Sequence, residues 1–159
     1  MQSGIRIEQS QWDNFERKPE AMKGQGLVQA YLELSAPITD ESQSFLYQND
    51  PMLVMQVIEA VVPTSAKVFI EQEVLGKMGI THYGWQTDEV SGLPGSASMT
   101  SRAMLKFGLL AESNGKWGKQ QLVPKGYLAE AMAKQVITGD DDVFGGGKDV
   151  TNQGYGFYW

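Results

Sequence analysis

Few residues in this chain of 159 amino acids have side chains suited to catalysis or metal binding. His82 is the single histidine and cysteine is absent, so thiolate ligands, disulfides and cysteine nucleophiles are excluded. A catalytic serine would have to pair with His82, and no nucleophile-elbow motif is present. One histidine without cysteines is also too little for an ordinary transition-metal site. We therefore expect no enzyme activity, no catalytic residue, no metal site and no cofactor.

Two motifs near the C-terminus could in principle bind ions. Gly145-Gly146-Gly147-Lys148 lacks the glycine spacing and the following helix of a phosphate loop, and we interpret it as flexible linker. Asp140-Asp141-Asp142 lacks the alternating ligands and the bidentate glutamate of a calcium loop. We interpret this triplet as part of an acidic, Gly-rich and aromatic tail that covers residues 139–159.

Charge is distributed unevenly along a chain whose net charge is −6. Residues 1–62 hold four bases and nine acids, residues 63–138 hold eight bases and six acids, and the tail holds one base and four acids. The stretch from Arg102 to Lys134 alone has six bases and two acids. Such a basic stripe is typical of a DNA-contacting face with acidic flanks, but chance clustering on a solvated surface explains it equally well.

The first 50 residues predict an acidic, partly helical N-terminal extension. Trp12 and Phe15 are three apart and could lie on one face of a short helix. Residues 26–34 are apolar and fit a strand or a helix, since periodicity does not decide for so short a run. Thr39 is placed to cap another helix that ends near Gln48.

Residues 51–80 predict two helices. Asp50-Pro51 provides an N-cap and a proline at the first helical position of a helix over 52–62. Residues 63–65 stop that helix and cap the next, which covers 66–78 with one apolar stripe. Gly79 is placed as the residue after its C-cap.

A second group of elements follows an expected irregular loop at residues 81–95. A helix is predicted over 96–110, with Ser96 or Ser98 as its N-cap. Asn114-Gly115 is a strong signal for a two-residue hairpin turn within residues 111–123.

Three short sequences in this region match a known pattern. Phe107-Gly108-Leu109-Leu110 ends one helix, the predicted hairpin follows, and Val123-Pro124-Lys125-Gly126-Tyr127 opens a last helix over 127–137. Residues 96–135 thus resemble the core of winged-helix DNA-binding domains of MarR-like and related transcription regulators. The chain departs from that pattern through its 81–95 loop, where family members have a tight turn, and through its N-terminal extension.

The resemblance implies a mainly α fold with a small β-hairpin, a winged helix-turn-helix over 51–138 preceded by residues 1–50. It also implies that the 96–110 helix and the 111–123 wing contact double-stranded DNA. A helical projection places Met99, Ala103, Met104 and Phe107 towards the core.

The opposite side of the same helix carries hydroxyls and long bases, which suit phosphates and base edges. These residues are Ser98, Ser101, Arg102 and Lys106. Arg102 is our candidate for a base contact, because its planar guanidinium can bond a guanine edge twice. Leu105 also points outward and could meet a thymine methyl or pack on this chain.

The predicted wing contains Lys116, Trp117 and Lys119 around Gly118. The lysines could reach phosphates and the indole could lie along a groove. Alternatively, the helix is an ordinary amphipathic one and Trp117 covers the core. We favour DNA contact over that interpretation.

The chain ends in four aromatic residues within five positions: Tyr155, Phe157, Tyr158 and Trp159. Exposed, they would form a costly apolar surface, so they either dock on this chain or bind a partner. We favour docking on the same chain or on a second copy in a homodimer.

The longest apolar stretch is interrupted by Gln56 and Glu59, so no membrane contact is expected. Our first hypothesis is a cytoplasmic DNA-binding regulator of transcription or replication from a bacterium, phage or mobile element. The second is a protein-interaction module on the same scaffold, acting as adaptor, inhibitor or DNA mimic. The third is an assembly protein whose aromatic tail makes the interface.

Overall fold

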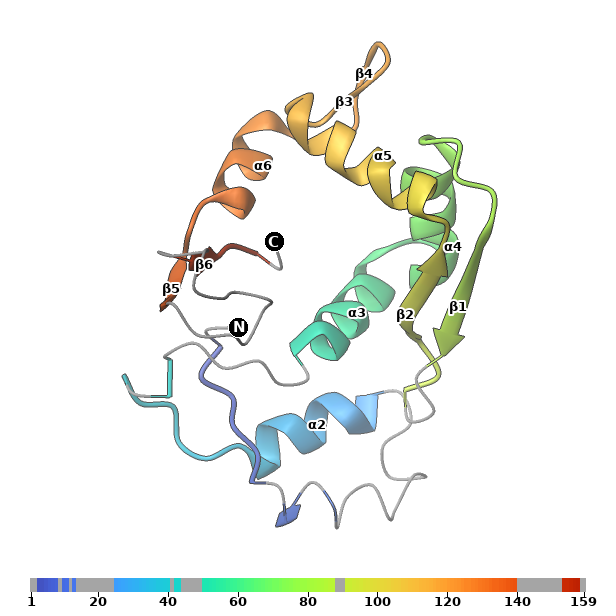
Figure 1. The fold of residues 1–159 in the computed structure, drawn as a ribbon. Helices are drawn as coiled ribbons and strands as arrows, with labels where there is room; N and C mark the ends of the chain where they lie inside the picture. The colour runs from blue at the N-terminus through green and yellow to red at the C-terminus, as the bar shows by residue number, and fades with distance from the viewer. Residues whose placement is uncertain are drawn as a thin grey trace. The chain divides into compact units, whose positions relative to one another are not determined.

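The computed structural model combines helices with small antiparallel two-stranded sheets (Figure 1). It describes residues 3–8, 10–11, 13, 25–40, 42–43, 50–87, 91–139 and 153–157. The chain divides into two compact units, residues 1–103 and residues 104–159. No single helix in the described ranges is long and apolar enough to cross a membrane; only α3 with the α4–η2 segment, bent by 90°, reaches that length and composition as a pair.

The elements follow one another in a simple order. The first unit contains α2 (Gln25–Leu34), α3 (Asp50–Val61), α4 (Ala66–Ile70), the π-helix η2 (Glu71–Gly76), β1 (Tyr83–Thr87) and β2 (Pro94–Met99). Helix α5 (Ser101–Glu112) begins in the first unit and continues in the second. The second unit then contains β3 (Lys116–Trp117), β4 (Gln120–Gln121), α6 (Lys125–Met132), β5 (Val136–Gly139) and β6 (Gln153–Tyr155).

Helix α2 resolves the strand-or-helix alternative for residues 26–34. Tyr31, which is 2% exposed, packs with Ile7 from the N-terminal segment. Half-buried side chains around this pair are Ile5, Leu34, Met52 and Leu53. Thr39 accepts a hydrogen bond from the amide of Ser42 and donates its own amide to the Ser42 hydroxyl, which is the reciprocal pattern of a capping box. Residues 44–48 of the helix predicted after Thr39 lie outside the described residues. A short helix was expected to carry Trp12 and Phe15 on one face, and both of these residues lie outside the described part of the chain.

Helices α3 and α4 confirm the predicted pair. Helix α3 begins at Asp50–Pro51, and the Ser65 hydroxyl caps α4 by accepting from the amide of Val68 at 3.3 Å. The Glu59 carboxylate adds a second cap, since its Oε2 accepts from the amide of Ala66 at 2.6 Å.

The helix changes to π geometry at Glu71, and η2 ends at Gly76, two residues before the predicted end at residue 78. The chain turns at Gly79, which follows the helix as predicted. Gly79 has φ of 62°, its amide bonds the carbonyl of Gly76, and the amide of Ile80 bonds the carbonyl of Leu75 at 2.8 Å. This is a Schellman motif with Gly79 as the residue after the C-cap. Leu75 and Ile80 are both buried, in the two positions between which a hydrophobic contact frequently accompanies the motif.

The prediction of an irregular loop over residues 81–95 is wrong for residues 83–87 and 94–95, which belong to the two strands of a β-hairpin. Strand β1 pairs antiparallel with β2 from Tyr83↔Met99 to Thr87↔Pro94, with a bulge after Gln86. The sequence of β2, PGSASM, has small residues with low strand propensity. Pairing with the aromatic residues of β1, rather than local preference, therefore makes this segment a strand.

Helix α5 begins at Ser101, five residues later than predicted. Its N-cap is Thr100, whose hydroxyl accepts from the amide of Ala103 at 3.2 Å. Ser96 and Ser98 are in β2 and do not cap the helix.

The predicted hairpin exists, but its turn is at a different position. Asn114 and Gly115 have φ of 52° and 81° and end α5: the amide of Gly115 bonds the carbonyl of Leu110, and that of Asn114 bonds Ala111. The turn is Gly118-Lys119, with φ of +59° at Gly118, as in a type II′ turn. Asn-Gly was misread because positive φ is equally suited to a helix C-terminus.

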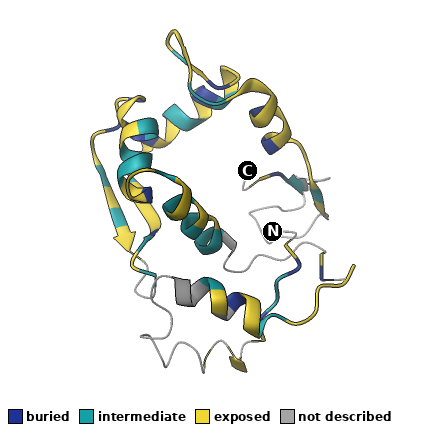
Figure 2. Cartoon of the chain, turned by 180° about the vertical axis from the view of Figure 1, so that it is seen from behind, coloured by how far each residue is buried: buried dark blue, intermediate teal, exposed yellow. Residues whose placement is uncertain are grey.

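The last predicted helix is also shorter than expected. Helix α6 covers Lys125–Met132 rather than 127–137, and Val136–Gly139 is β5, which pairs antiparallel with β6. Figure 2 shows α6 largely exposed, with buried positions on one side; these include Leu128 and Ala131.

Candidate nucleic-acid interface

The β3–β4 hairpin is held firmly at its base. The side-chain amide of Gln121 donates to the carbonyls of Asn114 at 2.7 Å and Val123 at 2.6 Å. The carbonyl of Gly115 accepts from the amides of Leu122 and Val123. A Cβ at Gly115 would lie 2.1 Å from the Val123 carbonyl oxygen, so only glycine allows this approach.

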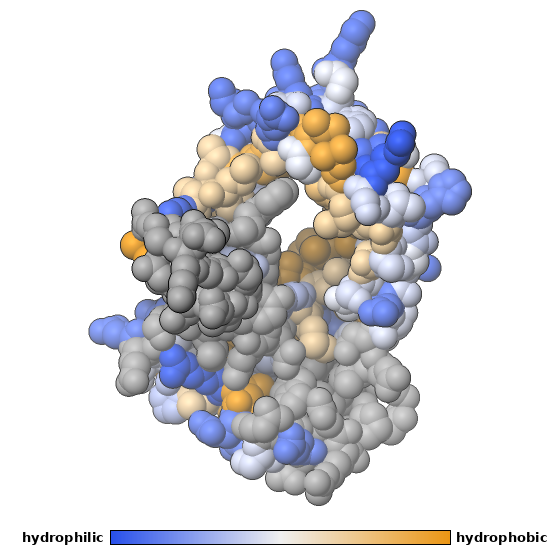
Figure 3. Space-filling model, viewed as in Figure 1, coloured by the Kyte–Doolittle hydropathy of each residue, from blue (hydrophilic) through white to orange (hydrophobic). Residues whose placement is uncertain are grey.

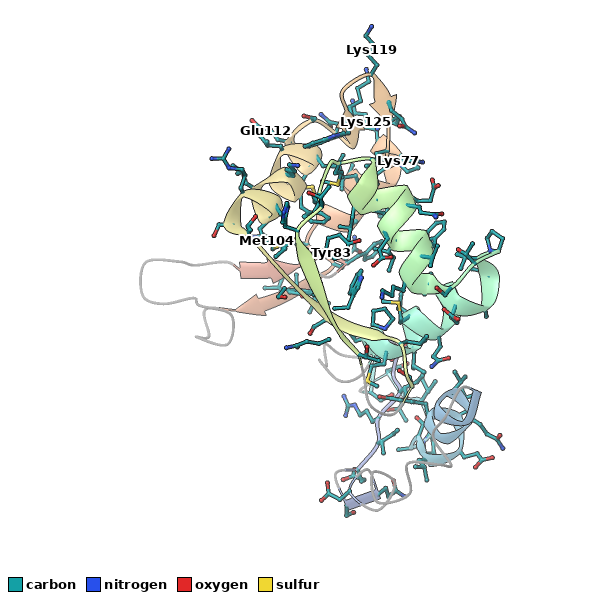
Figure 4. The ribbon with its side chains drawn as sticks, turned by 90° about the vertical axis from the view of Figure 1, so that its right-hand side faces the viewer. Lys77, Tyr83, Met104, Glu112, Lys119 and Lys125 are labelled. Carbon is teal, nitrogen blue, oxygen red and sulfur yellow. The ribbon has the colours of Figure 1, made fainter. Side chains whose placement is uncertain are left out.

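The hairpin presents its lysines to solvent. Lys116 and Lys119 are exposed, whereas Trp117 is half-buried. Lys119 lies at the end of the hairpin (Figure 4), and Figure 3 shows hydrophilic side chains gathered there. The predicted wing residues are therefore brought together on one small element, with Trp117 on the opposite face from Lys116 because successive strand residues alternate.

Lys125 is a further exposed cation that the sequence analysis did not select. It is the first residue of α6. It lies two positions after Val123, whose carbonyl accepts the hydrogen bond from the Gln121 side chain at the base of the hairpin. Residues 104–139 contain five lysines and two glutamates. The local excess of positive charge over this stretch was the signal that could have identified Lys125.

Of the four residues predicted to contact DNA from the 96–110 helix, three lie on α5 and one does not. Ser98 is wrong as a helix residue: it faces Gly84 in the β1–β2 hairpin, with its hydroxyl 3.5 Å from the Gly84 carbonyl oxygen. Ser101 and Arg102 are exposed in the first turn of α5, and Lys106 is half-buried. Ser101 and Arg102 belong to the first unit, and Lys106 belongs to the second.

The buried side of α5 differs from the predicted one at two positions. Met99 precedes the helix and is half-buried in β2. Ala103 and Leu110 are buried and Phe107 is half-buried, but Met104 is 57% exposed. At 3.6 residues per turn, Met104 lies about 100° around the helix from Ala103, outside the stripe of 103, 107 and 110. Leu105 is 62% exposed.

A different cluster, in the first unit, was missed altogether. Oε1 of Glu71 accepts from the indole Nε1 of Trp85 at 2.8 Å. The rings of Trp85 and Tyr83 meet edge to face with centroids 6.0 Å apart. Partial burial, the charge of Glu71 and a hydrogen bond to it raise the pKa of Tyr83 above 10.0. This cluster ties β1 to η2, and no motif in the sequence announces it.

The aromatic tail docks on its own unit where the structure describes it. Strand β6 contains Tyr155, and the amide of Phe157 donates to the carbonyl of Ala131 at 2.8 Å. The ring of Phe157 lies 6.2 Å from that of Tyr127. Tyr158 and Trp159 lie outside the described residues.

The described residues contain no group of three histidine, cysteine, aspartate or glutamate side chains able to hold a metal ion. Asp140–Asp142 and Gly145–Lys148 are not among these residues. Comparison of the chain with protein-family models, curated proteins and solved structures gave no match.

Proposed function

We propose that this chain binds double-stranded DNA through the β3–β4 hairpin, which acts as the wing of a winged helix whose recognition helix is α5. The observation that carries the proposal is the pair of exposed lysines, Lys116 and Lys119, on a hairpin fixed at its base. A fixed element loses little conformational entropy on binding. Lysine ammonium groups on it would neutralise phosphates and release counterions.

The hairpin supplies affinity rather than sequence preference. Phosphate contacts position a protein on the duplex, whereas base edges specify the site. Base contacts fall to the first turn of α5, because recognition helices read bases with their N-terminal residues. Ser101 and Arg102 are exposed there, and Arg102 is the candidate for a guanine edge. A regulator of transcription or replication would use both kinds of contact.

The test is fluorescence anisotropy of a labelled random duplex with the full chain, at low and moderate salt. We expect binding that weakens steeply with salt, and a several-fold loss of affinity with a smaller salt slope for Lys119→Ala. Lys119→Arg keeps the charge and should bind as wild type does.

The matched control is Lys67→Ala, which removes one exposed lysine from α4 in the first unit. It changes net charge by the same amount and should leave affinity nearly unchanged. Equal losses for Lys67→Ala and Lys119→Ala would show that only net charge matters. Absence of binding at low salt, where nonspecific attraction is strongest, would overturn the proposal.

A second candidate function is docking of a protein on α5. Leu105 and Leu109 lie one helical turn apart, 62% and 44% exposed, and this apolar pair is unusual for a helix that faces phosphates. A chain that binds no duplex but loses a partner on Leu105→Gln and Leu109→Gln would be such a module.

A further inference from the structure

The facing sides of α2 and α3, both in the first unit, form an open cleft of about 760 Å³. This volume is within the range of roughly 300–1,000 Å³ that small-molecule sites occupy. Tyr31, 2% exposed, lies on its wall, and Leu32 and Val57, 68% and 61% exposed, also line it. Figure 3 shows apolar side chains along α3 on the visible face. The cleft is therefore a largely apolar surface accessible to a ligand.

One polar group in the cleft has an unmet hydrogen-bonding requirement. Nε2 of Gln56 is buried and has no hydrogen-bond partner among the residues that the structure describes. A buried donor without an acceptor costs on the order of 1–3 kcal/mol. The other amide in the lining, Gln29, already donates its Nε2 to Glu33 at 2.6 Å. Gln56 is thus the group that a ligand acceptor would satisfy.

The charge of the lining restricts the ligand further. Among the residues that the structure describes, the lining contains one carboxylate, Glu59, and no lysine, arginine or histidine. The Glu59 carboxylate is already engaged as the cap of α4 through the amide of Ala66. An anionic ligand would find a negative charge and no cation, so the lining selects against fatty-acid carboxylates.

We infer that the α2–α3 cleft binds a neutral, mainly apolar small molecule that carries a carbonyl or similar oxygen acceptor for Gln56. The cleft shares no residue with the proposed DNA contact, which uses Ser101, Arg102, Lys116 and Lys119.

The experiment uses two neutral fluorescent probes with the full chain: Nile red, which has a carbonyl acceptor, and diphenylhexatriene, a hydrocarbon without one. We expect saturable binding of both. Gln56→Leu replaces the amide by an apolar side chain of similar size and so removes the donor. It should weaken Nile red about 3- to 10-fold, the range of one hydrogen bond, and leave diphenylhexatriene unchanged.

Ala60→Trp tests the location, because Ala60 lines the cleft and is exposed, so a large side chain there can obstruct the cleft without disturbing the core. It should abolish binding of both probes. The matched control is Val61→Trp, the next residue of α3, which is 73% exposed and is not part of the lining. Circular dichroism confirms that each variant is folded.

Several results would overturn the inference. They are no saturable binding by the wild type, equal binding by Ala60→Trp and the wild type, or equal losses of both probes in Gln56→Leu. Displacement of Nile red by dodecanoate would show that anions are accepted. Loss of probe binding as the protein dimerises with concentration, followed by sedimentation velocity, would assign the cleft to a second copy of the chain.

Discussion

The indole Nε1 of Trp85 donates a hydrogen bond of 2.8 Å to Oε1 of Glu71. The two residues are 14 positions apart and belong to different elements, β1 and the π-helix η2. Both side chains are half-buried, so water can replace either partner only in part. This bond is one specific contact between the β1–β2 hairpin and the helical part of the first unit.

Trp85→Phe should therefore lower the free energy of unfolding by more than the loss of buried apolar area alone would. A hydrogen bond to a charged group contributes about 1.5–3 kcal/mol, and Phe keeps an aromatic ring beside Tyr83 while removing the donor. Urea unfolding of Trp85→Phe, Glu71→Met, which removes the acceptor, and the double variant gives the coupling free energy. Additive effects of the two substitutions would show that the bond contributes nothing.

The raised pKa of Tyr83 predicts a loss of stability in alkali. The unfolded chain ionises this phenol near 10.0 and the folded chain ionises it higher, so the folded state holds the proton more tightly. The contribution of this proton to the free energy of unfolding is fully present below pH 10 and is lost as pH rises through the folded pKa. The difference in tyrosinate absorbance between wild type and Tyr83→Phe measures the midpoint, and a midpoint at or below 10.0 would contradict this assignment.

The position of the α5 N-cap predicts a contrast between two hydroxyl residues. Thr100→Ala removes the acceptor for the amide of Ala103 and should cost about 1 kcal/mol of unfolding free energy. Ser98→Ala should cost little, because its hydroxyl contacts only the Gly84 carbonyl at 3.5 Å and it does not cap the helix. Equal effects in urea unfolding would place the start of α5 elsewhere.

Two glycines with positive φ on either side of β3 should differ in their tolerance of a side chain. Gly115→Ala would place a Cβ 2.1 Å from the Val123 carbonyl oxygen, whereas no atom lies within 4 Å of a Cβ at Gly118. Both variants carry the conformational cost of about 1–2 kcal/mol for a left-handed residue. Thermal unfolding should show Gly115→Ala to be clearly the less stable, and similar melting temperatures would contradict the tight base of the hairpin.

Local sequence signals were sufficient where the physical cause is itself local. Asp50-Pro51 starts α3, Ser65 caps α4, and Gly79 ends the following helix, all as predicted. Each of these depends on the conformational limits of proline and glycine or on a hydroxyl within three residues of the amide it caps. The charge excess around Lys116 and Lys119 was likewise readable from the sequence.

Tertiary structure decided the elements for which local signals were weak or ambiguous. The small residues of β2 became a strand only through pairing with Tyr83 and Trp85. Residues 136 and 137, predicted to end the last helix, belong instead to β5, which pairs with β6. Asn114-Gly115 permits positive φ in either context, so only the bonds to Leu110 and Ala111 show that it ends a helix. The Glu71–Trp85 bond and the cleft at Gln56 join residues from separate elements. The sequence by itself therefore determined the start of α3, the cap of α4, the turn at Gly79 and where positive charge lies, because these depend on near neighbours. Strand pairing, the buried side of α5 and the cleft were decided by contacts between distant residues.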